Sequence, residues 1–385
     1  MAIVIPNTTE STAIVSIVLI TAFALSFRKS EPNGIFPLSV SQELKGLGIL
    51  SIVFAHISYM LVDDHKFLYP LSKGAGVGVD LFLFMSGYGL SASMLKKPLS
   101  TIEFYKRRLI KVFIPFWIVL IGLFVADAIF LNRHYSTGYL IQSFLGWFPR
   151  NSPYEDVNSP FWYITWMLLF YILFPLLFYK ERLWLSALLL CTAANLVTVF
   201  NLLNTETNWW LGLHTVAFPL GMLFAWLLLG TPADDNRFVT KLTQLRDEFS
   251  GLWRYVFMIL LSLFAAYMAA HNEPKDWPKL SQWVDEIGNI SAAHLIGQTC
   301  SILAMTALII VFCMKRLDNR LLSLFGAYSY ETYLLHWPLM ARYDIYFHTL
   351  PAWTATLLWL LTFIVMGRFL QNASQSVGTW VDSKW

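Results

Sequence analysis

The chain has 385 residues, of which 57% are apolar and only 13% are charged. A soluble globular domain carries about 25% charged residues, so this chain has too little polar surface to cover a water-facing globule. The same composition excludes a disordered chain, a collagen and a coiled coil. It predicts a polytopic membrane protein with lipid as its main solvent and partner. The net charge of only +3 indicates no nucleic-acid partner.

The apolar residues gather in eleven segments. Each has roughly the 17 to 25 residues that a helix needs to cross about 30 Å of hydrocarbon. They lie at residues 11–27, 44–62, 77–95, 112–131, 160–179, 183–203, 209–229, 253–270, 290–314, 321–341 and 350–370. We therefore expect an all-α bundle of about 10–11 transmembrane helices.

The expected domain organisation is simple. Residues 1–40 form an N-terminal helix and inner loop, residues 41–375 form one transmembrane domain, and residues 376–385 form a short cytoplasmic tail. If the N-terminus lies outside, 20 of the 27 basic residues fall in inner segments. This bias follows the positive-inside rule and predicts a cytoplasmic C-terminus. Two outer segments, residues 132–159 and 271–289, are long enough to be lids or binding surfaces, and equally to be passive connectors.

Lys45 and His56 are eleven residues apart in one apolar run. Eleven steps of about 100° place both side chains on one helix face, about 16 Å apart along the axis. We expect Lys45 at the inner surface and His56 near the middle of the membrane. Gly46 and Gly48 would allow a second helix or a ligand to approach closely. The pair indicates either a phosphate anchor with a base above it or an interfacial lysine with an unrelated buried histidine.

The segment KKPLSTIEFYKRRLIKVFIP, residues 96–115, is expected to be an inner loop with six basic residues. Such a cluster binds phosphates, or anionic lipid headgroups, or simply marks the cytoplasmic side. Further titratable groups are expected at membrane depth, where each is either functional or a hydrogen-bonded structural residue. They are Asp80, Asp127, His214, His294, Glu331 and His336.

Several motifs, taken in order, resemble the acyltransferase-3 family of integral membrane acyltransferases over about residues 41–340. They are Lys45-x10-His56, GVGVDLFLFMSGYGL (76–90), FYKRRLIKVFIP (104–115), FWYI (161–164) and YSYETYLLHWPL (328–339). This chain departs from the family pattern at Lys45 and Lys111, where arginine is usual, and at Tyr88, where phenylalanine is usual. One extra span precedes the first motif. We expect no soluble esterase-like domain after the last span, and a step assigned to that domain would then be absent or done by a partner.

The resemblance implies transfer of an acyl group, most often acetyl, from cytosolic acyl-CoA to a hydroxyl of an envelope polysaccharide or lipid-linked glycan. The setting it implies is a bacterial inner membrane. Lys45, Arg107, Arg108 and Lys111 would hold the CoA phosphates, and no metal is expected. His56 would act as general base or carry the acyl group itself, and Asp80 would orient His56 or a basic partner. The expected substrate contacts are Ser86, Trp162, Tyr330, Glu331 and His336.

Two other functions stay open at this point. Basic inner segments, buried histidines and helices interrupted by proline also suit a membrane transporter of an anionic solute. A transporter has no special need for the x10 spacing together with the FYKRR segment. A non-catalytic component of a glycan export complex is the third interpretation, and it predicts that His56→Ala leaves function intact.

Overall fold

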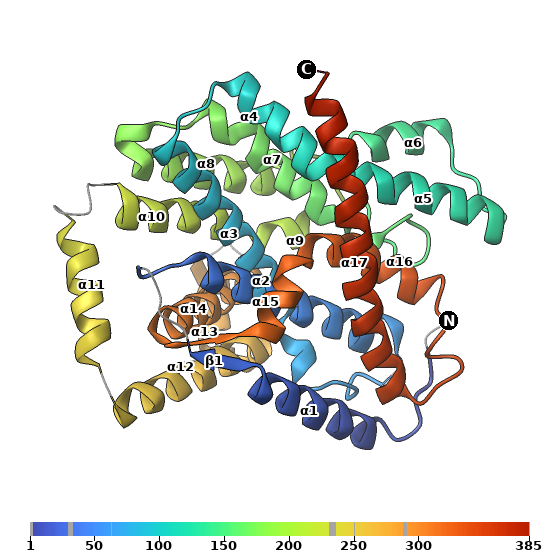
Figure 1. Ribbon diagram of the computed structural model, residues 1–385, viewed down its shortest axis with the longest axis horizontal. Coiled ribbons are helices and arrows are strands. Elements are labelled where there is room, and N and C mark those ends of the chain that lie inside the picture. Colours follow the sequence, from blue (N-terminus) through green and yellow to red (C-terminus); the bar gives the residue numbers. More distant parts are fainter. Residues whose placement is uncertain are drawn as a thin grey trace.

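The computed structural model describes residues 3–29, 34–62, 64–230, 236–249, 251–287 and 291–384. These residues are predominantly helical, and the helices lie side by side in one bundle (Figure 1). The longer helices are α1 (Thr8–Leu25), α2 (Leu38–His56), α3 (Ala75–Lys96), α5 (Ile114–Phe130), α7 (Trp162–Leu176), α8 (Leu183–Val199), α10 (Ala217–Leu229), α12 (Leu252–Ala270), α14 (Ala292–Met314), α16 (Ser329–Ala341) and α17 (Ala352–Asp382).

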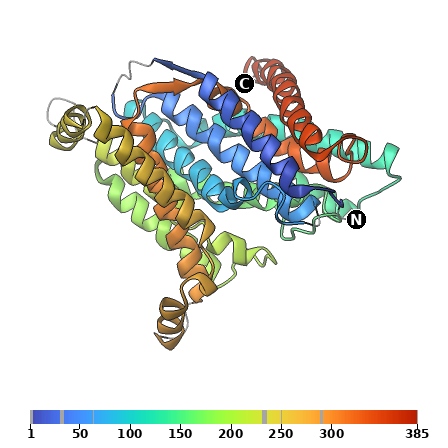
Figure 2. The ribbon, with the colours of Figure 1, turned by 90° about the horizontal axis from the view of Figure 1, so that it is seen from below.

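Shorter elements connect these helices. The short helices are α4 (Thr101–Arg108), α6 (Thr137–Phe144), α9 (Asn208–Gly212), α11 (Arg237–Glu248), α13 (Pro278–Ile287) and α15 (Arg320–Ala327). Two three-residue strands, β1 (Phe27–Lys29) and β2 (Leu317–Asn319), pair antiparallel. They join the segment after α1 to the segment before α15. Figure 2 shows α13 projecting from one end of the bundle.

Among the described residues, ten helical stretches are long and apolar enough to cross a membrane. This confirms the expected all-α, multi-pass bundle. The span expected at residues 321–341 is instead made by α15 and α16, which meet at Tyr328. The backbone of Tyr328 leaves helical geometry, with φ −111° and ψ 19°. The break falls in the sequence AYSYET (327–332), where Ser329, Glu331 and Thr332 interrupt the apolar character of the expected span.

The basic segment expected as an inner loop is helical from Thr101 onward. The hydroxyl of Ser100 accepts a hydrogen bond from the Glu103 amide and caps the start of α4. The chain then runs through a π-helical turn, η3 (Leu109–Phe113), directly into α5. Pro115 has no N–H to donate, and the wider turn before it removes the need for that donor. The basic side chains are therefore held at fixed angles around one helix.

Two further segments differ from their sequence-based description. Helix α17 continues to Asp382, well past the expected end at residue 370, and Asp382 lies 3.1 Å from the ammonium of Lys106. The two long segments expected on the outer side contain helices of their own, α6 within residues 132–159 and α13 within residues 271–289.

Glycines allow close packing at the centre of the bundle. A Cβ added to Gly46 in α2 would overlap the backbone carbonyl of Leu322 in α15. Between α2 and α3, a Cβ added to Gly78 would lie 2.6 Å from the carbonyl oxygen of Gly48. The expected close approach at Gly46 and Gly48 is thus confirmed, and in both cases the neighbour is another helix. Small residues at such contacts are the usual means of bringing membrane helices together.

Candidate active site

A cavity of about 550 Å³ opens among α2, α3, α7, η3, α16 and the segment between α9 and α10. Lys45, Arg108 and Lys111 line it near one end of the bundle, where α2 begins and α3 ends. We call this the basic end. The opposite end is where α7 and α10 begin, and the cavity lining there includes Trp162 and His214. The positive-inside pattern predicts that the basic end faces the cytoplasm.

Lys45 and His56 both line this cavity, as their spacing on one helix face predicted. His56 does not lie in the middle of its span, however, because the apolar stretch runs from Leu38 to Tyr59 and His56 is in its last turn. The helix starts seven residues before Lys45, so Lys45 itself sits about 10 Å inside it. Lys45 thus lines the basic end of the cavity, and His56 lines the same cavity about 16 Å further along α2.

His56 is hydrogen-bonded to a second histidine. Its Nδ1 lies 2.7 Å from Nε2 of His336, and the two rings are nearly parallel. Nδ1 of His336 lies 2.8 Å and 3.1 Å from the backbone carbonyl oxygens of Tyr333 and Thr332. A carbonyl only accepts, so His336 must carry its proton on Nδ1 and offer a lone pair at Nε2.

This arrangement determines the tautomer of His56. Because Nε2 of His336 accepts, Nδ1–H of His56 donates, and Nε2 of His56 keeps its lone pair. His56 lines the cavity, while His336 is fully buried behind it. The structure therefore presents an unprotonated imidazole nitrogen, the form needed by a general base or a nucleophile. His336, expected to contact substrate, does not line the cavity and contacts His56 instead.

Three cations line the basic end without a counter-charge. Within the described part of the chain, no carboxylate lies within 4 Å of the charged nitrogens of Lys45, Arg108 or Lys111. Nε of Arg108 is buried and has no hydrogen-bond partner there. Unpaired charges in a partly buried site are unfavourable and create a strong preference for an anion.

Arg107 does not belong to this group. Its guanidinium is exposed and lies 2.8 Å from the carboxylate of Glu103, one turn earlier in α4. Neighbouring residues on a helix point about 100° apart, so Arg108 faces the cavity and Arg107 faces away. Sequence alone could not separate the two, because both belong to the same motif.

Asp80 contacts a histidine other than His56. The fully buried carboxylate lies 2.7 Å from Nδ1 of His214, and its other oxygen accepts a hydrogen bond from the Ser301 hydroxyl. Asp80 was expected to orient either His56 or a basic partner. In the structure its partner is His214 and not His56. Trp162 stacks on the His214 ring with a centroid distance of 5.9 Å. His214 stood among the membrane-depth candidates, but its pairing with Asp80 was not foreseen.

The remaining expected contacts divide into two groups. Ser86, Trp162 and Tyr330 line the cavity. Glu331 does not: its side chain is buried on the face of α16 that packs against α17 near Gly367.

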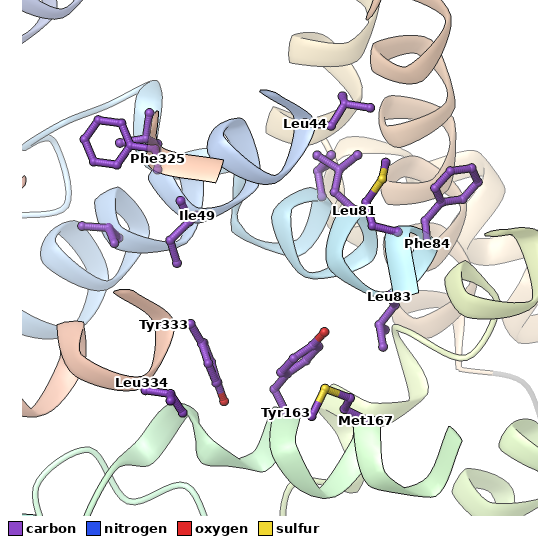
Figure 3. Close-up of a cluster of buried hydrophobic side chains, with 14 of the residues drawn as sticks. Leu44, Ile49, Leu81, Leu83, Phe84, Tyr163, Met167, Phe325, Tyr333 and Leu334 are labelled. Atoms are coloured by element: carbon purple, nitrogen blue, oxygen red, sulfur yellow. The ribbon is translucent and has the colours of Figure 1, made fainter. Parts of the chain in front are cut away.

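Two tyrosines and the segment at residues 132–159 complete the cavity lining. Figure 3 shows Tyr163 from α7 and Tyr333 from α16 directed into the space between these helices and α3. Their rings are 5.4 Å apart, and the Tyr333 hydroxyl donates to the carbonyl of Pro160. Asn151 and Ser159, from the segment at 132–159, also line the cavity. No described residue of the segment at 271–289 does so.

Asp127 and His294 are outside the cavity lining. The Asp127 carboxylate pairs with the guanidinium of Arg342 and accepts hydrogen bonds from Tyr135 and Tyr343. His294 packs on Trp209 and lies 3.0 Å from its carbonyl oxygen. Both residues hold neighbouring segments together, which is the structural role left open for them.

The family comparison covers the part of the chain that forms this site. The family model described as an acyltransferase domain matches residues 44–367. This range contains the His56–His336 pair, the Asp80–His214 pair and the three cations of the basic end. No curated protein and no solved structure matches the chain significantly. The chain is a multi-pass membrane acyltransferase and belongs to the acyltransferase-3 family.

Proposed function

We propose that this protein transfers an acyl group, acetyl in the first instance, from acyl-CoA to a hydroxyl of an envelope polysaccharide or lipid-linked glycan. One observation carries the proposal. A single cavity joins three cations, which have no carboxylate partner among the described residues, to a histidine about 16 Å further along α2 whose Nε2 carries a lone pair.

This arrangement fits the shape and charge of the donor. Acyl-CoA carries its phosphates at one end and its thioester at the end of a long flexible arm. Arg108 can grip a phosphate with its forked guanidinium, while Lys45 and Lys111 act as point charges. The arm then extends along α2 toward His56. The cavity volume of about 550 Å³ lies within the range of small-molecule sites.

His56 is the residue we assign to the acyl group. His56 lines the cavity, and because its Nδ1–H donates to His336, the lone pair of its neutral ring is on Nε2. When Nε2 of His56 gains a proton or an acyl group, the hydrogen bond from Nδ1–H to His336 strengthens and spreads the positive charge over two rings. Neither ring needs to move, so the pair is preorganised for transfer.

The acceptor enters from the opposite end in this proposal. Trp162 and Trp210 line the cavity there, together with Asn151. Flat aromatic faces with nearby amide groups suit a sugar, whose C–H faces stack and whose hydroxyls form hydrogen bonds. With the basic end in the cytosol, the donor and the acceptor would reach the cavity from opposite sides of a bacterial cytoplasmic membrane.

The test measures ester-linked acetate on extracted envelope glycans. Wild type is compared with a deletion strain and with that strain carrying His56→Ala or the control His348→Ala at matched expression. His348 is 67% exposed and outside the cavity. We expect acetate to fall on deletion and to return with His348→Ala but not with His56→Ala. Unchanged acetate on deletion, with no stabilisation of the purified protein by acetyl-CoA, would contradict the proposal and favour transport of another anion.

A further inference from the structure

Among the described residues, two imidazoles line this cavity, His56 and His214. His56 is hydrogen-bonded to a neutral imidazole, whereas His214 is paired with the Asp80 carboxylate. We infer that the Asp80–His214 pair is a second acid–base group, which takes the proton from the acceptor hydroxyl while His56 carries the acyl group. This inference rests on the proposed acyl transfer and divides it between two histidines. No feature of the sequence motifs assigned a role to His214.

The two pairs are built for different tasks. Behind His56 stands a neutral imidazole, whereas behind His214 stands the Asp80 carboxylate. A proton on Nε2 of His214 makes an imidazolium 2.7 Å from that carboxylate, and the pair is then neutral overall. Within the described residues, no other cation lies within 4 Å of Asp80, so the carboxylate is available to balance this charge. A base oriented by a buried carboxylate is the arrangement that hydrolases use to activate a hydroxyl.

The surroundings of His214 fix the ring. Asp80 holds Nδ1, Ser301 holds Asp80, and Trp162 stacks on one face of the imidazole. Trp166 donates its indole N–H to the His214 carbonyl at 3.2 Å, which anchors the turn between α9 and α10. This leaves Nε2 as the nitrogen available to the cavity, at the end opposite the basic cluster. His214 is therefore placed where we expect the acceptor to enter.

The reaction then takes two steps. First, Nε2 of His56 attacks the thioester carbonyl carbon, the C–S bond breaks, and CoA leaves as a thiolate that takes a proton from solvent. Second, the acceptor oxygen attacks the acyl carbon on His56 and its proton passes to Nε2 of His214. The C–N bond breaks, its electron pair returns to His56, and His214 releases the proton to solvent. The net change is acyl-CoA and alcohol to ester and CoA.

Isotope exchange separates the two steps without needing the acceptor. Detergent-purified protein is incubated with acetyl-CoA and radiolabelled CoA, and label appearing in acetyl-CoA reports the first step. Transfer is measured separately, as labelled acetate entering envelope glycans in inside-out membrane vesicles. We expect His214→Ala to keep exchange within about threefold of wild type and to lose transfer by about 10²- to 10⁴-fold, the contribution of a general base. His56→Ala should lose both activities.

Further variants exclude a merely structural effect. Added imidazole should restore part of the transfer in His214→Ala, since a small base can occupy the vacated space. Asp80→Asn, which removes the charge but keeps the shape, should likewise lose transfer and keep exchange. His348→Ala is the matched control, because His348 also faces an aspartate, Asp344 at 3.9 Å, but is exposed. If His214→Ala fails to fold, His214→Gln replaces it.

The outcomes are distinct. Wild-type transfer in His214→Ala or His214→Gln overturns the inference. Loss of exchange together with transfer in a variant that acetyl-CoA still stabilises also overturns it, because His214 would then serve the first step. A wild-type protein that transfers acetate without exchange refutes the acyl-His56 step. A wild-type protein that neither binds acetyl-CoA nor transfers acetate instead refutes the proposed function.

Discussion

Nδ1 of His56 lies 2.7 Å from Nε2 of His336, although the two residues are 280 positions apart in the sequence. Helix α16 begins after the break at Tyr328 and packs against α2, which places His336, in the third turn of α16, beside the last turn of α2. Because of this contact, the neutral His56 ring carries its proton on Nδ1 and its lone pair on Nε2.

The first prediction concerns His336. His336→Phe keeps an aromatic ring but removes the acceptor, so Nδ1–H of His56 loses its partner and the ring is free to change tautomer. We expect acetyl transfer to fall by about 10²- to 10⁴-fold, close to the loss in His56→Ala, as for removal of an acid–base group. Stabilisation of the purified protein by CoA should persist, since the basic end is untouched. Near-normal transfer in His336→Phe would show that the tautomer of His56 does not matter.

The second prediction compares adjacent arginines. Arg108→Ala removes a cation that lines the cavity, whereas Arg107→Ala removes one that pairs with Glu103 outside it. A charged hydrogen bond contributes about 1.5–3 kcal/mol, so Arg108→Ala should weaken CoA binding by roughly 10- to 100-fold. Arg107→Ala should change it by less than about threefold. Calorimetric titration of CoA into purified protein measures both, and equal losses would place the phosphate site elsewhere.

The third prediction concerns packing. Gly46→Ala forces a methyl group into the backbone carbonyl of Leu322, which cannot swing aside as a side chain could. We expect a loss of about 1–3 kcal/mol or more in the free energy of unfolding, from helices forced apart. Gly122→Ala is the matched control, because nothing lies within 4 Å of the added atom. Thermal unfolding in detergent compares the two variants, and equal midpoints would contradict the close α2–α15 contact.

Local periodicity explains why part of the site was predictable. Lys45 and His56 share one helix, so their common face follows from about 100° per residue, and the structure places both in one cavity. Arg107 and Arg108 show the limit of that reasoning, since a motif does not say which member faces inward. Which face of a helix points inward depends on the helices packed around it, here α2 and α16, whose residues line the same cavity.

Contacts between distant helices were not predictable. Asp80 and His214 are 134 positions apart, and Asp80 could equally have met His56 by sequence alone. The choice depends on how α3 packs against α10, the helix that follows the turn carrying His214. Gly87 contributes to that packing, because a Cβ there would overlap the backbone carbonyl of Phe218 in α10. Such backbone-to-backbone approaches are set by the whole bundle rather than by any one segment.

The fourth prediction concerns the segment at residues 132–159 and its response to pH. Burial raises the pKa of the Asp156 carboxyl, although the Ser152 amide at 2.7 Å and the Tyr139 hydroxyl at 3.3 Å donate hydrogen bonds to it. The folded protein therefore binds this proton more tightly than the unfolded chain, whose aspartate pKa is about 3.9. The resulting stabilisation is complete below that value and is lost as pH rises through the raised pKa.

Asp156→Asn removes this titration while keeping one hydrogen-bond acceptor. We expect the thermal midpoint of wild type, relative to that of Asp156→Asn, to fall as pH is raised from about 3.5 through the raised pKa. Glu155→Gln, at the exposed neighbouring position, should leave the wild-type pH dependence in place. A wild-type midpoint that instead rose relative to Asp156→Asn over the same range would mean that the hydrogen bonds outweigh burial. The carboxylate, rather than its protonated form, would then hold this segment beside the cavity.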